Sequence, residues 1–426
     1  MSRIPQQRRA SDHPCEAGGV RFTTELELLW ACCVALRADC QEKLKYLLTR
    51  RYDFAAFMTL AREHRVIPQV YRSISVHSEL LDGADLATLR SAYEENARRA
   101  LCLTGELLRV LRHFQRHGID VLPYKGPVLA QRLYGDVTAR QFFDLDILVS
   151  PQDVGAAKAA LAQLGYVPEI KLSAREQTSF IASGYEYAFS GAAGHHTLEL
   201  KWRILPRFYS VEFDTEAFSA RAKNLVIGTY SVPTLCDDDL LLVLCVHAAK
   251  HMWSQLSWWC DIAEITRSRQ IQWETICSKA EQLGIGRIVA VSLLLVHDLL
   301  QSDLPISVQE WCRKDSEIGI LSEQISGMIS EGSSYETGSS SYFTFMLRLR
   351  ERSWDKLRFL RRLVWTPSIG EWSVTRLPPE LSFAYHFVRM GRLACRIFSP
   401  HLRRGRAPQT RSGWPILWRS SRMGRE

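Results

Sequence analysis

Hydrophobic residues recur at helical spacing in the N-terminal and C-terminal parts of the chain, and at strand spacing only between them. Near the N-terminus they fall on one helical face, at Leu26, Leu29, Trp30, Cys33 and Leu36. Spacings of three and four residues predict amphipathic helices. A long amphipathic segment, about 86–117, stops before Gly118, a favourable residue just beyond a helix. Helical patterns return between 237 and about 330.

The middle of the chain predicts short strands. They are 119–124 (IDVLPY), 143–149 (FDLDILV) and 197–204 (TLELKWRI), with 224–232 as a further candidate. Residues 128–134 and 152–164 predict helices, the second with Ser150 as its N-cap and Pro151 at its first position. A small βαβ-containing unit between helical regions predicts an α+β protein.

Changes in composition divide the chain further. Residues 331–342 (EGSSYETGSSSY) are rich in Gly and Ser and predict a linker or mobile loop. The expected parts are a disordered N-terminus (1–20), an N-terminal helical region (21–117), a core with the strands (118–235), a helical region (236–330), the linker (331–342), a C-terminal helical segment (343–400) and a basic, disordered tail (401–426).

Composition and charge narrow the class of protein. With 426 residues and 46% apolar content, the chain is long enough for a sizeable core. It has 11 cysteines and no C-x-x-C pair, which is typical of a reducing compartment. No signal peptide and no apolar run long enough to span a bilayer occur, so we expect a cytoplasmic protein without a membrane span.

The net charge of +8 is concentrated near the C-terminus. Residues 343–426 hold 18 Lys+Arg and 5 Asp+Glu, which leaves the rest of the chain mildly acidic. A basic tail suggests nucleic acid or an anionic surface as partner, and a disordered solubilising tail is the alternative. No pattern of a nucleic-acid-binding module occurs in the sequence.

Candidate chemistry centres on 124–149 (YKGPVLAQRLYGDVTARQFFDLDILV). Asp144 and Asp146 are two residues apart on a predicted strand, so their carboxylates share a face. The mutual repulsion of the pair is relieved by a cation, and Mg²⁺ prefers such hard oxygen ligands. A strand end with two solvated acids is the alternative. Lys125 and Gly126 follow the preceding strand, where a glycine lets backbone N–H groups approach a phosphate.

A third carboxylate, Glu199, lies on the third predicted strand and shares a face with Lys201. Three carboxylates on adjacent strands opposite a glycine turn are typical of a two-metal site for phosphoryl or nucleotidyl transfer.

These motifs resemble a known family. The chain is similar to the bacterial uncharacterised nucleotidyltransferases of the DNA polymerase β-type superfamily. That group carries K-G-x-x-L, L-Y, an arginine, D-[IL]-D-[IL]-L-V, G-[YF] and an acidic-L-H-W-R strand. In this chain they are Lys125 to Leu129, Leu133-Tyr134, Arg140, Asp144 to Val149, Gly165-Tyr166 and Glu199 to Arg203. The resemblance runs from about 96 to 267. Two positions depart from the pattern, since Pro127 follows the glycine and Lys201 stands where the group usually has histidine.

The resemblance implies a small mixed sheet as the nucleotidyltransferase core, flanked by helical regions. It implies that Asp144, Asp146 and Glu199 hold Mg²⁺ and carry the chemistry, with Glu199 helping to deprotonate the acceptor. For the nucleotide it suggests Lys125, Gly126, Arg140 and Lys201, where Arg140 has an ion pair as its alternative. His247, His251 and Asp261 are candidates for lining the cleft, although packing roles are open for all three.

We therefore expect an enzyme that moves a nucleoside monophosphate from an NTP, with ATP as the expected donor, to a hydroxyl of a small-molecule or protein acceptor. One alternative is a non-catalytic, nucleotide-binding regulatory protein of the same fold, which Pro127 and Lys201 favour. Another is a nucleic-acid-binding partner that acts through the basic tail. The sequence specifies neither the acceptor nor the oligomeric state.

Overall fold

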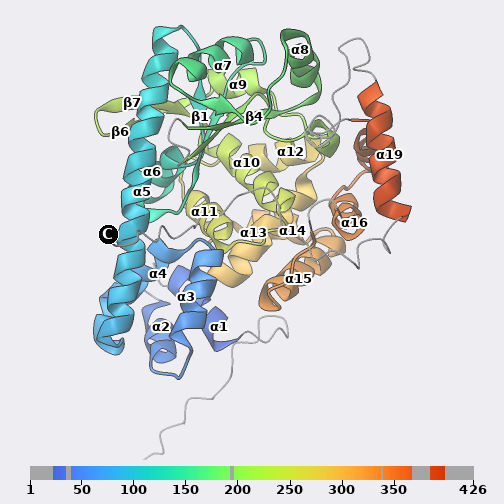
Figure 1. The fold of residues 1–426 in the computed structure, drawn as a ribbon. Coiled ribbons are helices and arrows are strands. Elements are labelled where there is room, and N and C mark those ends of the chain that lie inside the picture. The colour runs from blue at the N-terminus through green and yellow to red at the C-terminus, as the bar shows by residue number, and fades with distance from the viewer. Residues whose placement is uncertain (1–22, 35–39, 192–195, 337–338, 367–383, 399–426) are drawn as a thin grey trace, which may run out of the picture.

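Groups of helices surround one small β-sheet in the computed structural model (Figure 1). The structure describes residues 23–34, 40–191, 196–336, 339–366 and 384–398. It is 65% helical with a mixed five-stranded sheet, so the predicted α+β class is confirmed. Within the described ranges, no helix combines the length and the apolar character needed to cross a membrane.

The N-terminal helical region is α1 (Thr24–Val34), α2 (Gln41–Leu48), α3 (Phe54–Glu63), α4 (Ile67–Ile74) and α5 (Gly83–Arg116), with the 3₁₀ turn η2 (Ser75–Leu80) before α5. Helix α5 runs along one side of the molecule, from these helices to the sheet (Figure 1). Asp82 caps it by accepting a hydrogen bond from the Ala84 N–H. Gly118 follows it with φ +63°, as the amphipathic pattern predicted.

The sheet has the order β1-β2-β5-β4-β3. Its strands are β1 (Leu122–Pro123), β2 (Asp144–Leu148), β3 (Val167–Pro168), β4 (Glu186–Ser190) and β5 (Thr197–Lys201). Strands β2 and β5 are parallel, and the other neighbouring pairs are antiparallel. The predicted second and third strands are confirmed, whereas only two residues of 119–124 pair as β1. Strands β3 and β4 were not predicted.

The elements around the sheet are α6 (Pro127–Tyr134), η3 (Val137–Ala139), α7 (Val154–Gln163), α8 (Ala174–Ser183), η4 (Arg207–Tyr209), α9 (Thr215–Ala220), β6 (Lys223–Ile227) and β7 (Tyr230–Thr234). The predicted cap at Ser150 is wrong. The Ser150 carbonyl accepts a hydrogen bond from the Asp153 N–H, so residues 150–153 form a turn and α7 begins only after it. The predicted strand 224–232 is a hairpin of β6 and β7.

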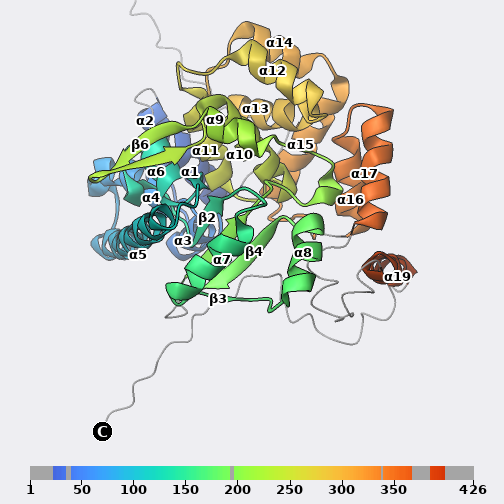
Figure 2. The same cartoon turned by 90° about the horizontal axis from the view of Figure 1, so that it is seen from above.

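The remaining helices are α10 (Asp237–Lys250), α11 (Leu256–Thr266), α12 (Trp273–Gln282), α13 (Gly286–Leu300), α14 (Ile306–Arg313), α15 (Ser316–Ser330), α16 (Ser340–Arg348), α17 (Ser353–Trp365) and α19 (Tyr385–Phe398). Figure 2 shows α10 to α15 on one side of the sheet and α17 and α19 at the edge of the molecule. Helix α16 starts inside the predicted linker, where Tyr342 is buried and donates to the Lys250 carbonyl at 2.8 Å. The predicted segments 1–20 and 401–426 lie outside the described residues.

Burial of one sheet face determines where the carboxylates point. Leu145 and Ile147 of β2 and Leu198 and Leu200 of β5 are buried in one hydrophobic cluster. Burial of each such side chain contributes roughly 1.5–3 kcal/mol. A slip by one residue would move all four out of this cluster to the face that carries the charged residues, so the packing holds the strand register and directs the intervening polar residues to the opposite face.

Candidate active site

The strand register brings the predicted carboxylates together. Asp146 lies opposite Glu199 in the β2–β5 pair, and Asp144 precedes it by two positions on the same face. On the other side of β5, Glu186 of β4 lies opposite Lys201. We call Asp144, Asp146, Glu186 and Glu199 the carboxylate cluster.

Lys201 lies within this cluster. Its Nζ is 2.5 Å from Glu199 Oε2, 2.5 Å from Glu186 Oε2 and 3.3 Å from Asp146 Oδ1. The side chain is only 5% exposed. The phosphate-binding role of Lys201 stays a prediction, but in this arrangement its ammonium donates to carboxylates of the protein itself.

The Lys125-Gly126 turn lies directly beside the strand that carries the aspartates. Gly126 has φ +58°, and a Cβ at this position would be 3.2 Å from the backbone oxygen of Asp144. Both the positive φ and the close approach favour glycine. Lys125 Nζ lies 3.9 Å from Asp146 Oδ1. The predicted proximity of the turn and the carboxylates is therefore found, and Pro127 occupies the first turn of α6.

Protonation within the cluster is uneven. Burial raises the pKa of Glu199 to about 8; the ammonium of Lys201 opposes this shift, and the nearby Glu186 and Asp146 add to it. Burial also raises the pKa of Asp144, and repulsion from Asp146 adds to the rise. For Asp146 the effect of burial is outweighed by Lys125 and Lys201, so its pKa is lowered. The cluster therefore combines two carboxylates of lowered pKa, Asp146 and Glu186, with two of raised pKa, Asp144 and Glu199.

The two predicted histidines face the cluster from α10 and its C-terminal end. His247 Nδ1 is 2.9 Å from Lys125 Nζ, and the rings of His247 and His251 both contact Trp258, with centroids 5.2 and 5.3 Å away. Burial lowers the pKa of both histidines well below the usual value, and nearby lysines add to the effect. His247 is thus neutral at neutral pH and accepts a hydrogen bond from Lys125.

Arg140 and Asp261 form a buried ion pair with each other. Arg140 Nε lies 3.0 and 2.9 Å from the two oxygens of Asp261, and Tyr134 Oη donates to the same carboxylate at 3.0 Å. Asp261 is fully buried. This pairing joins α11 to the segment that leads into β2. Nucleotide binding by Arg140 and a role of Asp261 in the cleft stay predictions, and the contacts account for both as structural groups.

Three charged residues of the site were not among the predicted ones. Glu186 belongs to a strand that was not recognised, although the alternation in Glu186–Ser190 was a usable signal. The Lys250 ammonium lies over the Tyr185 ring, 5.2 Å from its centre, and its positive charge helps to lower the pKa of Glu186. Arg65 lies between α3 and α4 with φ +56°, and its positive charge opposes the rise in the pKa of Asp144.

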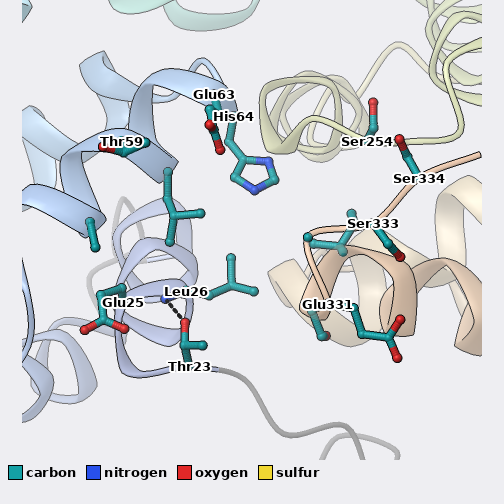
Figure 3. A pocket seen from close by; sticks show the side chains of 15 residues that line it. Thr23, Glu25, Leu26, Thr59, Glu63, His64, Ser254, Glu331, Ser333 and Ser334 are labelled. Atoms are coloured by element: carbon teal, nitrogen blue, oxygen red, sulfur yellow. Dashed lines mark hydrogen bonds between the residues drawn. The ribbon is translucent and has the colours of Figure 1, made fainter. Parts of the chain in front are cut away.

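A cavity of about 570 Å³ opens between the N-terminal helices and the end of α15 (Figure 3). Glu25, Glu63 and His64 line one wall, and Ser254 and Glu331 line the other. No residue of the carboxylate cluster lines this cavity.

The donor set fits one divalent cation better than two. Asp144 and Asp146 offer crowded hard oxygens on one face, which suit Mg²⁺ when substrate phosphates supply further ligands. Among the residues that the structure describes, however, no three His, Cys, Asp or Glu side chains come together in a way that could hold a metal ion. Glu199 and one oxygen of Asp146 are engaged by Lys201 instead.

The geometry agrees with the comparison to known families. Residues 50–301 match the family described as "uncharacterised nucleotidyltransferase", and the chain belongs to this family. The match covers more than half of the chain and includes α3 to α13 with the whole sheet. No curated protein and no solved structure matches the chain. The family supports nucleotidyl transfer as the general activity.

Proposed function

We propose that the protein transfers a nucleoside monophosphate from an NTP, with ATP as the expected donor, to a hydroxyl group of a small-molecule or protein acceptor. One observation carries the proposal: the register of β2 and β5 brings Asp144, Asp146 and Glu199 to one face, beside the Gly126 turn. Family membership supports the reaction class, and the site geometry supports the residue roles.

Asp144 and Asp146 would hold Mg²⁺, which neutralises charge on the triphosphate and polarises the reacting phosphate. The Gly126 turn lets the backbone approach the triphosphate closely, because glycine adopts the required positive φ without a Cβ. Lys125 adds a positive charge beside Asp146, and neutral His247 orients its ammonium.

Glu199 is the proposed general base. A base acts best when its pKa lies near the working pH, and burial places the pKa of Glu199 at about 8. Its carboxylate would take the proton of the acceptor hydroxyl as the hydroxyl oxygen attacks the α-phosphorus and pyrophosphate leaves in line.

The test is incubation of the protein with each NTP labelled at the α-phosphate, Mg²⁺ and cell extract. A labelled product that requires both the protein and Mg²⁺ is the expected result, together with release of pyrophosphate. Nucleotide binding without pyrophosphate release under any condition would favour the second candidate, a regulatory protein that binds nucleotide without turnover. This second candidate is favoured by the position of Lys201 among the carboxylates.

A further inference from the structure

The ammonium group of Lys201 has the surroundings of a bound cation. An ammonium has three N–H donors, and three carboxylates lie around Nζ: Glu186, Glu199 and Asp146, at 2.5, 2.5 and 3.3 Å. These acids come from three strands, with Lys201 on the central one. All three N–H donors are therefore matched by acceptors of the protein itself.

A second divalent ion would need the same oxygens. In a two-metal arrangement the second ion would be bound between Asp146 and Glu199, which lie opposite one another on β2 and β5. Asp146 Oδ1 and Glu199 Oε2 are the atoms that Lys201 contacts. Mg²⁺ binds its oxygens at about 2.0–2.1 Å, so an ion on these two atoms would be very close to Nζ. Two cations at that separation repel each other strongly.

Withdrawal of Lys201 would leave its partners uncompensated. Its side chain is 5% exposed, and Nζ lies 5.6 Å from the centre of the Tyr185 ring. Glu186, its partner across the β4–β5 pair, is buried with it and would lose its closest positive charge. A buried carboxylate without a partner is costly, so the arrangement favours Lys201 in place.

The Asp144 side of the cluster is not occupied by Lys201. No contact of Lys201 with Asp144 is found within the described residues, and Asp144 is only half-buried. Asp146 contacts Lys201 through Oδ1, so its second oxygen can join Asp144 in binding an ion. One divalent ion, shared with the phosphates of the nucleotide, therefore fits.

We propose that Lys201 takes the place of the second metal ion, so that this site binds one divalent ion together with its nucleotide. The inference rests on the proposed nucleotidyltransferase function and changes one part of it, because the two-metal site expected from the sequence becomes a site with one metal ion and one ammonium. Lys201 is then a positioning residue that keeps Glu199 and Asp146 in place.

The test counts metal ions on the full chain. Mn²⁺ replaces Mg²⁺, α,β-methylene-ATP serves as a nucleotide that cannot react, and free Mn²⁺ is measured by electron paramagnetic resonance during titration. We expect one Mn²⁺ per wild-type chain and two per chain of the Lys201→Met variant, which keeps the length of the side chain but vacates the cation position. Lys250→Met is the matched control, because it removes one positive charge from the same surroundings without vacating that position; it should bind one.

Two Mn²⁺ on the wild type would overturn this inference and leave the proposed function standing. One Mn²⁺ on Lys201→Met, or two on Lys250→Met, would also overturn it, because Lys201 would then not occupy a specific cation position. No Mn²⁺ on the wild type in the presence of the nucleotide would contradict the proposed function itself. If Lys201→Met does not fold, Lys201→Gln, which is neutral and keeps hydrogen bonds to the glutamates, replaces it in the test and should likewise bind two Mn²⁺; one Mn²⁺ on that variant would overturn the inference.

Discussion

Asp146 and Glu199 lie directly opposite one another on the parallel strands β2 and β5, with their side chains on the polar face of the sheet. Four further elements, α7, β3, α8 and β4, lie between these strands in the sequence. The pairing makes an aspartate and a glutamate from separate motifs into parts of one site.

Replacing both Asp144 and Asp146 by Asn should abolish Mg²⁺-dependent NTP binding without unfolding the protein. The relief of repulsion between the two crowded like charges offsets the loss of the Asp146 contacts with Lys125 and Lys201, so the metal-free protein should stay folded. Binding is measured by calorimetric titration with Mg²⁺ and NTP, and folding by circular dichroism. The matched control is Asp120→Asn with Asp153→Asn, which removes equal charge outside the cluster. Wild-type affinity in the Asp144 and Asp146 variant would show that the metal site lies elsewhere.

Glu199→Gln should lower turnover by roughly 10²-fold or more, with little change in nucleotide affinity. Removal of a general base acts on the transition state, whereas Asp144 and Asp146 can still hold the nucleotide-bound metal ion. The comparison is pyrophosphate release with a competent acceptor beside NTP affinity by titration. Equal turnover in the variant and the wild type would place Glu199 outside the reaction.

Asp261→Asn should destabilise the protein by about 3–5 kcal/mol, because it leaves the buried guanidinium of Arg140 without its counter-ion. Chemical denaturation gives the free energy of unfolding. Combining it with Arg140→Met should recover much of the loss, since no unpaired charge then remains. A stable single variant with impaired turnover would instead indicate a direct role of Asp261 in the reaction.

Acid should destabilise the wild type more than a His64→Asn variant. Burial lowers the pKa of His64 from 6.5 to about 4, so protonation is less favourable in the folded than in the unfolded protein. The stability is greatest above about pH 6.5 and falls progressively as the pH drops from 6.5 to about 4, by about 3 kcal/mol at 1.4 kcal/mol per pKa unit. Asn keeps an acceptor for the Leu256 N–H. Parallel stability curves of the two proteins between pH 7 and 4 would contradict this assignment.

Deletion of residues 401–426 should leave nucleotide binding unchanged. Each contact of the carboxylate cluster within the described part of the chain involves residues before 401. NTP titration of the shortened protein at several salt concentrations checks this expectation. Loss of nucleotide binding after deletion would show that the tail contributes to the site, and salt-sensitive nucleic-acid binding only by the full chain would support the alternative role of the tail.

The local spacing of hydrophobic residues was sufficient to predict many of the helices and strands. The amphipathic spacing identified α5 and the helices after 237, and alternation identified β2 and β5, because helical and strand periods are properties of neighbouring residues. The same alternation placed Asp144 and Asp146 on one face. The start of α7 was misplaced because Ser150 opens a turn, and a serine before a proline fits both structures.

The sequence by itself therefore determined the fold class, the aspartate pair and the glycine turn beside it. Only the tertiary structure decided which distant charges meet: Glu186 with Lys201, and Arg140 with Asp261. Such pairs depend on strand order and helix packing, which local spacing does not encode. The role of Lys201 shows the consequence most clearly. Along the chain it is a lysine two residues after a glutamate, whereas in the folded protein three carboxylates from three strands surround its ammonium group.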